Sequence, residues 1–123
     1  MKAMFVNSTR TTPFAWWIAH RLKTIETRQK NMLSALVGER VAIVETGSGH
    51  APLVVGHVDV IKSTFCDISE FDAHRSETLI PKGSKYDVRG TGKWFYHLAN
   101  AEPCEPYPLP PSAIRHGRSW CEF

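Results

Sequence analysis

Cysteine is scarce in this sequence, and long apolar runs are absent. The three cysteines, Cys66, Cys104 and Cys121, are odd in number and lie far apart, which argues against a disulfide framework. No pair of them has the spacing of metal ligands, so we expect neither a metal nor another cofactor. No apolar stretch approaches the roughly 20 residues that span a bilayer, and the N-terminus turns polar by Asn7, too early for a signal peptide. These absences predict a cytoplasmic protein with no membrane partner.

Repeats, low-complexity tracts and a strong charge imbalance are absent as well. The 123 residues are 42% hydrophobic and 22% charged, a composition typical of a folded chain, so we expect one domain spanning residues 1–123. The net charge of +3 permits an anionic partner without requiring one. Basic residues gather in the first quarter (Arg10, Arg21, Lys23, Arg28, Lys30) and near the end (Arg115, Arg118). On charge alone, a solvated surface explains both groups equally well.

The local patterns predict more strands than helices. We expect strands at residues 2–7, 24–28, 41–45, 53–61, 93–99 and 119–123, helices at 13–22 and 67–79, a short helix or bridge at 29–37, a loop at 81–92 and an extended proline-rich stretch at 103–111. Gly56 inside a strand predicts a bulge or a close approach of another backbone. Most strands follow residue 38 and do not alternate with helices. The order therefore predicts an α+β fold, a strongly curved or closed sheet of five to six strands with two or three helices at its rim.

Three charged residues around the second expected strand are the strongest functional candidates. Glu26 and Arg28 are two apart, so on a strand their side chains point to the same face and can form a charge-assisted pair. Lys23 comes from the helix–strand junction and can reach the same space. Such a group has donors for a carbonyl or phosphate oxygen and an acceptor for an amino group, which suits a nucleobase or nucleotide pocket. The alternative is an ion pair on an outer face, with no ligand and little energetic weight.

These residues also carry a resemblance to a known family. A helix, then Lys23-Thr24-Ile25-Glu26-Thr27-Arg28, then a strand beginning Gly38-Glu39-Arg40-Val41, resembles the ASCH family, whose hallmark is Gly-x-Lys-x-x-Glu-x-Arg. Three of the four fixed positions match. The resemblance implies a small barrel similar to the PUA domain of RNA-modifying enzymes. It continues in residues 54–58 and 110–120, and so covers nearly the whole chain.

One hallmark position departs from the family pattern. Arg21 stands where the glycine is usual, and only glycine adopts positive φ freely. The departure puts the turn between the helix and the strand in question.

Four tryptophans are many for a chain of this size, and unpaired bases stack on such rings. We expect Trp16 or Trp120 at the rim of the pocket, and Trp17 and Trp94 in the interior. The predicted ligand-binding residues are therefore Lys23, Glu26, Arg28, Trp16 and Trp120.

Catalysis is the alternative function. Some ASCH proteins of this size are amidohydrolases that remove the acetyl group of N4-acetylcytidine with a lysine, a threonine and a glutamate, and others resemble RNA-cleaving enzymes. The resemblance implies Lys23 as the lysine and, loosely, Glu77 as the glutamate, but Glu26 occupies the threonine position. Lys23 can act as a base only if burial lowers its pKa, and Glu26 should oppose that shift. Glu26 could instead activate water, with Lys23 polarising the bond to be broken.

The sequence thus predicts a protein that binds RNA or a modified nucleoside or nucleotide. A small hydrolase acting through Lys23 and Glu26 is the alternative. A protein-interaction domain without a small ligand is the third possibility, and it predicts a cavity filled by the chain's own side chains. The oligomeric state is not predicted.

Overall fold

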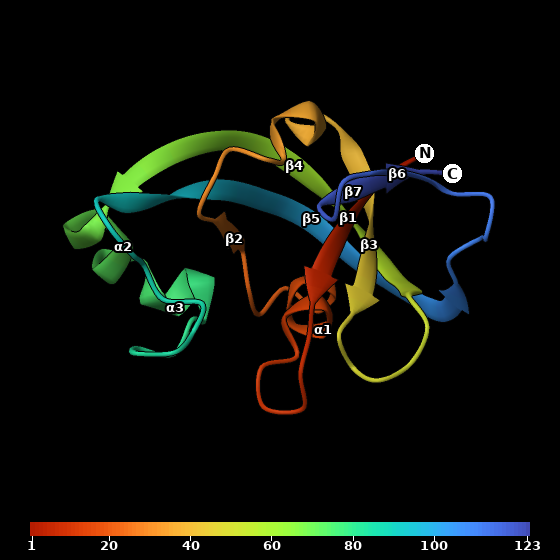
Figure 1. The fold of residues 1–123 in the computed structure, drawn as a ribbon, viewed down its shortest axis with the longest axis horizontal. Coiled ribbons are helices and arrows are strands. Elements are labelled where there is room, and N and C mark those ends of the chain that lie inside the picture. Colours follow the sequence, from red (N-terminus) through yellow and green to blue (C-terminus); the bar gives the residue numbers. More distant parts are fainter.

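Two long antiparallel strands, β4 (Leu53–Asp67) and β5 (Gly92–Pro108), bend into an arch that crosses the whole molecule (Figure 1). The computed structural model describes residues 1–123. The other strands are β1 (Lys2–Asn7), β2 (Ile25–Arg28), β3 (Arg40–Thr46), β6 (Ile114–His116) and β7 (Trp120–Glu122). All seven form one sheet in the order β2-β5-β4-β3-β1-β7-β6, in which β1 and β3 are parallel and every other pair is antiparallel.

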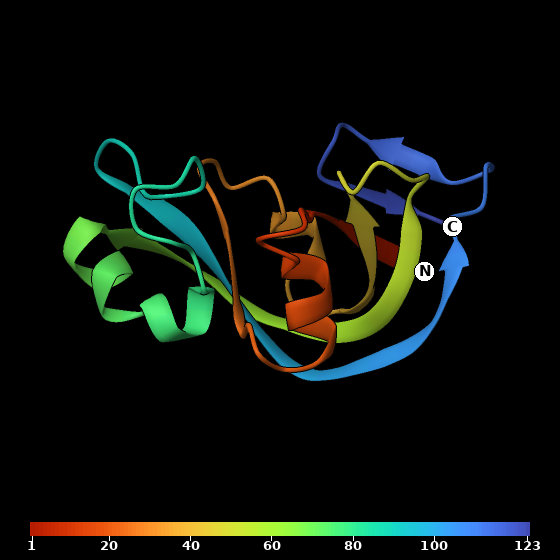
Figure 2. The ribbon, with the colours of Figure 1, turned by 90° about the horizontal axis from the view of Figure 1, so that it is seen from below.

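The helices are short and lie along the inside and one end of the arch. α1 (Phe14–Ala19) packs against β4, β3, β5 and β1, whereas α2 (Ile68–Ala73) and α3 (Arg75–Thr78) lie beyond the end of β4 (Figure 2). A single 3-10 turn, η1 (Ser34–Leu36), connects β2 to β3. The β6–β7 hairpin lies at the opposite end of the molecule from α2 (Figure 2). None of the helices is long and apolar enough to cross a membrane.

The sheet is buried on both faces in its middle strands. In β1, Met4 and Val6 join the main core beneath α1, while Ala3 and Phe5 join a smaller core against the β6–β7 hairpin. This is the period of two expected of a strand, but with apolar residues on both sides. The double burial fixes β1, and the carbonyl of Phe5 in this strand accepts a hydrogen bond from Arg28 of β2, which carries the predicted site.

The predicted α+β class with a strongly curved sheet is confirmed, and the details differ in strand number, strand length and the second helix. The sheet has seven strands, whereas five to six were expected. The sequence did not indicate the three-residue strand β6, because all of its residues are exposed and show no apolar alternation. β2 and β6 remain unpaired edges, so the sheet curves without closing. The long strands also run further than expected, because the proline-rich stretch to Pro108 pairs with β4. The second expected helix is broken in two at His74, after an N-cap at Asp67 that accepts a hydrogen bond from the Glu70 amide.

Gly56 marks a close approach, as predicted. A Cβ at this position would lie 2.5 Å from the carbonyl oxygen of Glu102 and 3.1 Å from the Cβ of Ala19. The pairing of β4 shifts register on both sides here, against β3 and against β5. The missing side chain therefore lets α1 and the arch pack together.

Arg21, at the position of the hallmark glycine, adopts a backbone conformation that glycine adopts freely. Its φ is +64°, in the left-handed region, and it ends α1 so that the amides of Leu22 and Lys23 both donate to the carbonyl of Trp17. A side chain in this conformation costs about 1–2 kcal/mol. The Nε of Arg21 donates to the carbonyl oxygen of Ala101 at 2.7 Å, which offsets part of that cost. The turn is therefore kept without the glycine.

Candidate functional site

The three hallmark side chains form an ion cluster along β2, with Lys23 just before the strand and Arg28 at its last residue. Glu26 Oε2 accepts a hydrogen bond from Arg28 Nη2 at 2.9 Å, and Glu26 Oε1 lies 3.6 Å from Lys23 Nζ. Lys23 is 1% exposed and Glu26 is 7% exposed. Arg28 also donates to the carbonyl oxygen of Phe5 at 2.6 Å, which ties β2 to β1. The geometry matches the expected same-face pair, with the carboxylate between two cations.

Backbone groups complete the cluster. Lys23 donates to the carbonyl oxygen of Thr78, at the end of α3, and its ammonium lies 4.8 Å from the centre of the Phe14 ring. The amide of Thr27 donates to Glu26 Oε1 at 3.2 Å. The cluster therefore joins α1, α3, β1 and β2, segments that are far apart in the sequence.

Burial and charge act on the lysine and the glutamate in opposite ways. Burial lowers the pKa of Lys23 from 10.5 to about 8, although the neighbouring Glu26 favours the charged form. Glu26 opposes this shift, as expected, but desolvation outweighs the ion pair. Burial also acts to raise the pKa of Glu26, but Arg28 and Lys23 outweigh it, and the net shift is downward. Glu26 is therefore a carboxylate at neutral pH. The pKa of Lys23, at about 8, lies only about one unit above neutral pH.

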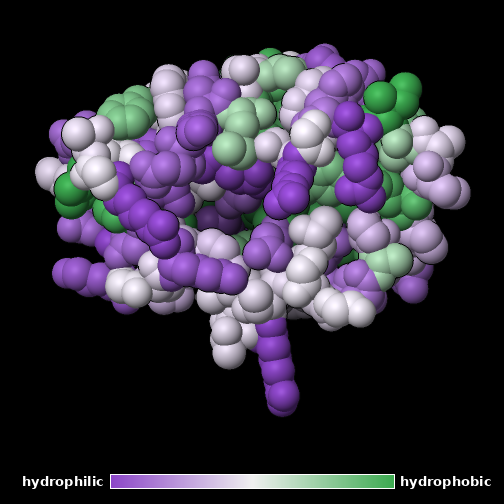
Figure 3. Space-filling model, in the orientation of Figure 1, coloured by the Kyte–Doolittle hydropathy of each residue, from purple (hydrophilic) through white to green (hydrophobic).

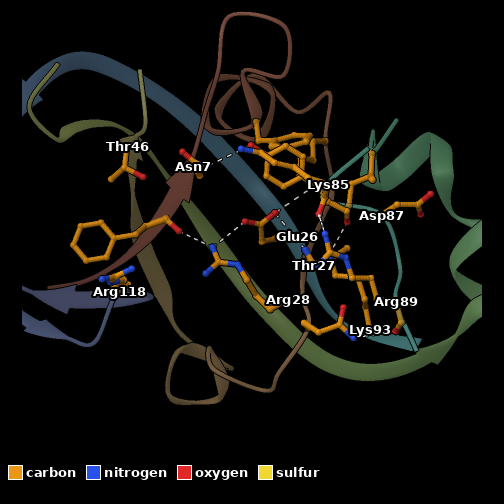
Figure 4. A pocket seen from close by; sticks show the side chains of 16 residues that line it. Asn7, Glu26, Thr27, Arg28, Thr46, Lys85, Asp87, Arg89, Lys93 and Arg118 are labelled. Carbon is orange, nitrogen blue, oxygen red and sulfur yellow. Dashed lines mark hydrogen bonds and ion pairs between the residues drawn. The ribbon is translucent and has the colours of Figure 1, made fainter. Parts of the chain in front are cut away.

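The cluster lines a cavity of about 350 Å³. This size falls within the range of small-molecule sites. Its hydrophilic rim surrounds a hollow near the middle of the face drawn in Figure 3. Besides Lys23, Glu26, Thr27 and Arg28, the lining consists of Phe5, Asn7, Phe14, Gln29, Thr46, Ile80, Lys85, Tyr86, Asp87, Arg89, Lys93 and Arg118 (Figure 4). The cavity is therefore not filled by the chain's own side chains.

Positive charge dominates this lining. Six side chains are basic and two are acidic, a larger excess than the net +3 of the whole chain. Both carboxylates are engaged within the protein: Glu26 with its two cations, and Asp87 with Arg75 at 2.8 Å and with the amides of Gly83 and Val88. By contrast, Lys85, Arg89 and Arg118 form no ion pair. The cavity thus has cationic groups available to an incoming anion.

No model of a protein family matches this chain, and no curated protein matches it. Solved structures do match: the ASCH protein of Zymomonas mobilis superposes with a TM-score of 0.70 at 19% identity, over 87% of this chain and 73% of that one. The chain has the ASCH fold. A serine-to-alanine variant of the same bacterial protein covers 98% of this chain and 87% of its own, with a TM-score of 0.74.

In this ASCH fold, the expected aromatic residues lie outside the cavity. Trp16 is 49% exposed and stacks on His20, with ring centres 3.8 Å apart, and Trp120 stacks on His116 in the β6–β7 hairpin. Neither indole is among the lining residues. The aromatic residues of the lining are Phe5, Phe14 and Tyr86, and the rings of Phe14 and Tyr86 meet edge to face at 5.1 Å.

The other sequence candidates separate in the same way. Glu77 lies in α3 with a half-exposed side chain that pairs with His74 at 2.9 Å, away from the cavity. None of the chain's histidines lines the cavity either. Thr27 lines it, whereas Thr24 does not. No group of three or more histidine, cysteine or carboxylate side chains is placed to hold a metal ion, and the three cysteines are free.

Sequence reasoning missed the loop side of the cavity. Lys85, Tyr86 and Arg89 come from the segment between α3 and β5 and look like ordinary loop residues in the sequence. Lys93 is the second residue of β5 and lies opposite Cys66 of β4. The available signal was its position two residues before Phe95 on a strand, which places a lysine on the same face as a core phenylalanine.

Proposed function

We propose that residues 1–123 form one cytoplasmic domain that binds RNA or a nucleotide in the cavity beside β2. The carrying observation is the excess of basic side chains around a cavity whose two carboxylates are already engaged by the protein itself. An anion entering this space meets cations without displacing an internal ion pair. The ASCH fold supports the proposal, since the family resemblance implies nucleic-acid or nucleoside ligands.

The cavity also has what a base requires. Tyr86 presents a partly exposed aromatic ring, and Asn7 donates through Nδ2 to the Tyr86 hydroxyl at 3.3 Å, which fixes the ring next to the polar wall. Asn7 and Thr46 add amide and hydroxyl groups that can pair with a base edge. Arg28 is held by Glu26 and by the carbonyl of Phe5, so it is preorganised to contact a ligand oxygen.

Arg118 offers the most direct test, because it lines the cavity from the turn of the β6–β7 hairpin and has no ion pair to lose. We expect Arg118→Gln to weaken binding of a labelled single-stranded RNA or a nucleoside monophosphate about tenfold, as measured by fluorescence anisotropy or calorimetry. The dependence of affinity on salt should also decrease by about one charge.

Arg10→Gln is the matched control, since Arg10 is exposed and lies outside the lining. It should leave affinity unchanged within about twofold. Equal losses in the two variants would mean that only the overall charge attracts the ligand. Absence of binding to any RNA, nucleoside or nucleotide by the unaltered protein would refute the proposal.

A hydrolase is the second candidate, and the pKa of Lys23 supports it. A buried lysine with a pKa of about 8, beside a carboxylate and within a ligand-sized cavity, is suited to proton transfer or to polarising a carbonyl. We expect such an enzyme to release acetate from N4-acetylcytidine or to cleave labelled RNA. Lys23→Met should lower the rate of either reaction at least a hundredfold. No turnover above that of Lys23→Met, at a temperature where both proteins are folded, would leave binding as the function.

A further inference from the structure

Lys93 is a buried cation without a carboxylate partner. The residue is 6% exposed, and its ammonium donates to the carbonyl oxygen of Tyr86 at 2.7 Å. No carboxylate forms an ion pair with it, in contrast to Lys23 on the other side of the cluster. One hydrogen bond satisfies only one of the three protons of an ammonium group. The other two N–H donors of Lys93 are on a side chain that lines the cavity.

Such an arrangement is expensive for the protein alone. An ammonium removed from water without a compensating anion is strongly disfavoured, and the pKa of Lys93 is lowered by burial to about 8. Two neighbouring carboxylates, Glu26 and Asp87, favour the protonated form of Lys93, and two neighbouring arginines, Arg28 and Arg89, disfavour it. Both of those carboxylates are engaged by other arginines. A bound anion would supply the missing partner.

The loop places two more cations on the same side of the cavity. Figure 4 shows Lys85, Arg89 and Lys93 on the side formed by the α3–β5 segment, opposite Asn7, Thr46 and Arg118. The backbone of this segment is fixed, because Gln29 donates to the carbonyls of Arg89 and Gly92 at 3.1 and 3.0 Å. Lys85 and Arg89 are exposed and form no ion pair, so they are available to a ligand in the cavity.

We infer that Lys93, with Lys85 and Arg89, forms a phosphate subsite on the loop side of the cavity. The inference rests on the proposed function, and it specifies that the ligand is recognised through a phosphoryl group and not through its base alone. Three cations around one oxyanion, one of them desolvated, match the demands of a phosphate. The opposite wall, with Asn7 and Thr46, then faces the sugar or base.

Lys93→Met tests the subsite, and the variant should remain folded. Methionine has a similar length and no charge, so the variant relieves the buried ammonium and should have a melting temperature equal to or above that of the unaltered protein. Binding is measured by calorimetry at pH 7 with four probes: inorganic phosphate, a nucleoside 5′-monophosphate, a dinucleoside phosphodiester and the free nucleoside. Lys82→Met is the matched control, because Lys82 is an exposed lysine of the same segment outside the lining.

We expect Lys93→Met to weaken binding of the monophosphate at least tenfold and to leave nucleoside binding unchanged, while Lys82→Met alters neither. A larger loss for the monophosphate than for the phosphodiester identifies a terminal phosphate, and the reverse identifies a phosphate within an RNA strand. If Lys93→Met binds every phosphate probe within twofold of the unaltered protein, the subsite is refuted. Binding of inorganic phosphate through Lys93 without binding of any nucleotide or RNA keeps the subsite and refutes the proposed function.

Discussion

Glu26→Gln should lower the free energy of unfolding by about 3 kcal/mol at pH 7, the largest effect expected of a single conservative change in this chain. The glutamine keeps the size of the side chain but removes the negative charge between Lys23 and Arg28. Two cations would then face each other in a buried space with no carboxylate between them. Urea denaturation followed by tryptophan fluorescence measures the change.

Two further variants separate the ion cluster from a general loss of packing. Glu77→Gln removes a half-exposed carboxylate that pairs with His74, and it should change the free energy of unfolding by less than about 0.5 kcal/mol. Adding Lys23→Met to Glu26→Gln removes one of the stranded cations and should recover part of the loss, so the two changes are not additive. If Glu26→Gln is as stable as Glu77→Gln, the cluster contributes nothing to folding.

The free energy of unfolding should rise between pH 8 and pH 9. Lys23 and Lys93 have folded-state pKa values of about 8 and an ordinary value of 10.5, so in this window the unfolded chain binds more protons than the folded one. Stability increases with pH wherever that is the case. Each lysine contributes about 1 kcal/mol between pH 8 and pH 9.

Other groups limit the window at its upper end. Burial raises the pKa of the thiols of Cys66, Cys104 and Cys121 above 9.0, so above that pH the folded chain retains protons that the unfolded chain loses. These thiols oppose the lysines. Urea denaturation at pH 8.0, 8.5 and 9.0 measures the net rise. The rise in the unaltered protein should exceed that in Lys93→Met by about 1 kcal/mol, because the thiols contribute equally to both proteins. A flat or falling curve in the unaltered protein would contradict the burial of these ammonium groups in solution.

The hallmark cluster was accessible from the sequence because its three residues are local. Glu26 and Arg28 share a strand face by the period of two alone, and Lys23 follows at the junction with α1. The turn at Arg21 was the uncertain point. The backbone keeps its left-handed turn there, because the arginine side chain gains a hydrogen bond to Ala101, 80 residues away. No local pattern contains that partner.

The proline-rich end of β5 is extended, as predicted, but its pairing with β4 was not foreseen. Pro103 and Pro108 lack an amide hydrogen, so they cannot donate to a strand on both sides. β2 pairs with β5 only from Trp94 to His97, so the later residues have β4 on one side and no partner on the other. Prolines are tolerated on such an edge. The loop side of the cavity was also hidden, because its residues meet β2 only after the arch brings β5 back beside it.

The exposed side chains of the segment between α3 and β5 can be substituted without altering the sheet. Asp87 anchors this segment by pairing with Arg75 and by accepting hydrogen bonds from two amides of the segment. Lys93 and Gln29 bind backbone carbonyls of the segment and of its junction with β5. The exposed Lys85 and Arg89 side chains contact only this same segment: Arg89 donates to the carbonyl oxygen of Lys85, and the Lys85 ammonium lies over the Tyr86 ring. Ligand preference in this scaffold is therefore open to revision by substitutions at exposed loop positions, whereas the buried hallmark stays fixed. The cavity is built as a constant half and an adjustable half, which makes the adjustable half the natural target for altering specificity by design or selection.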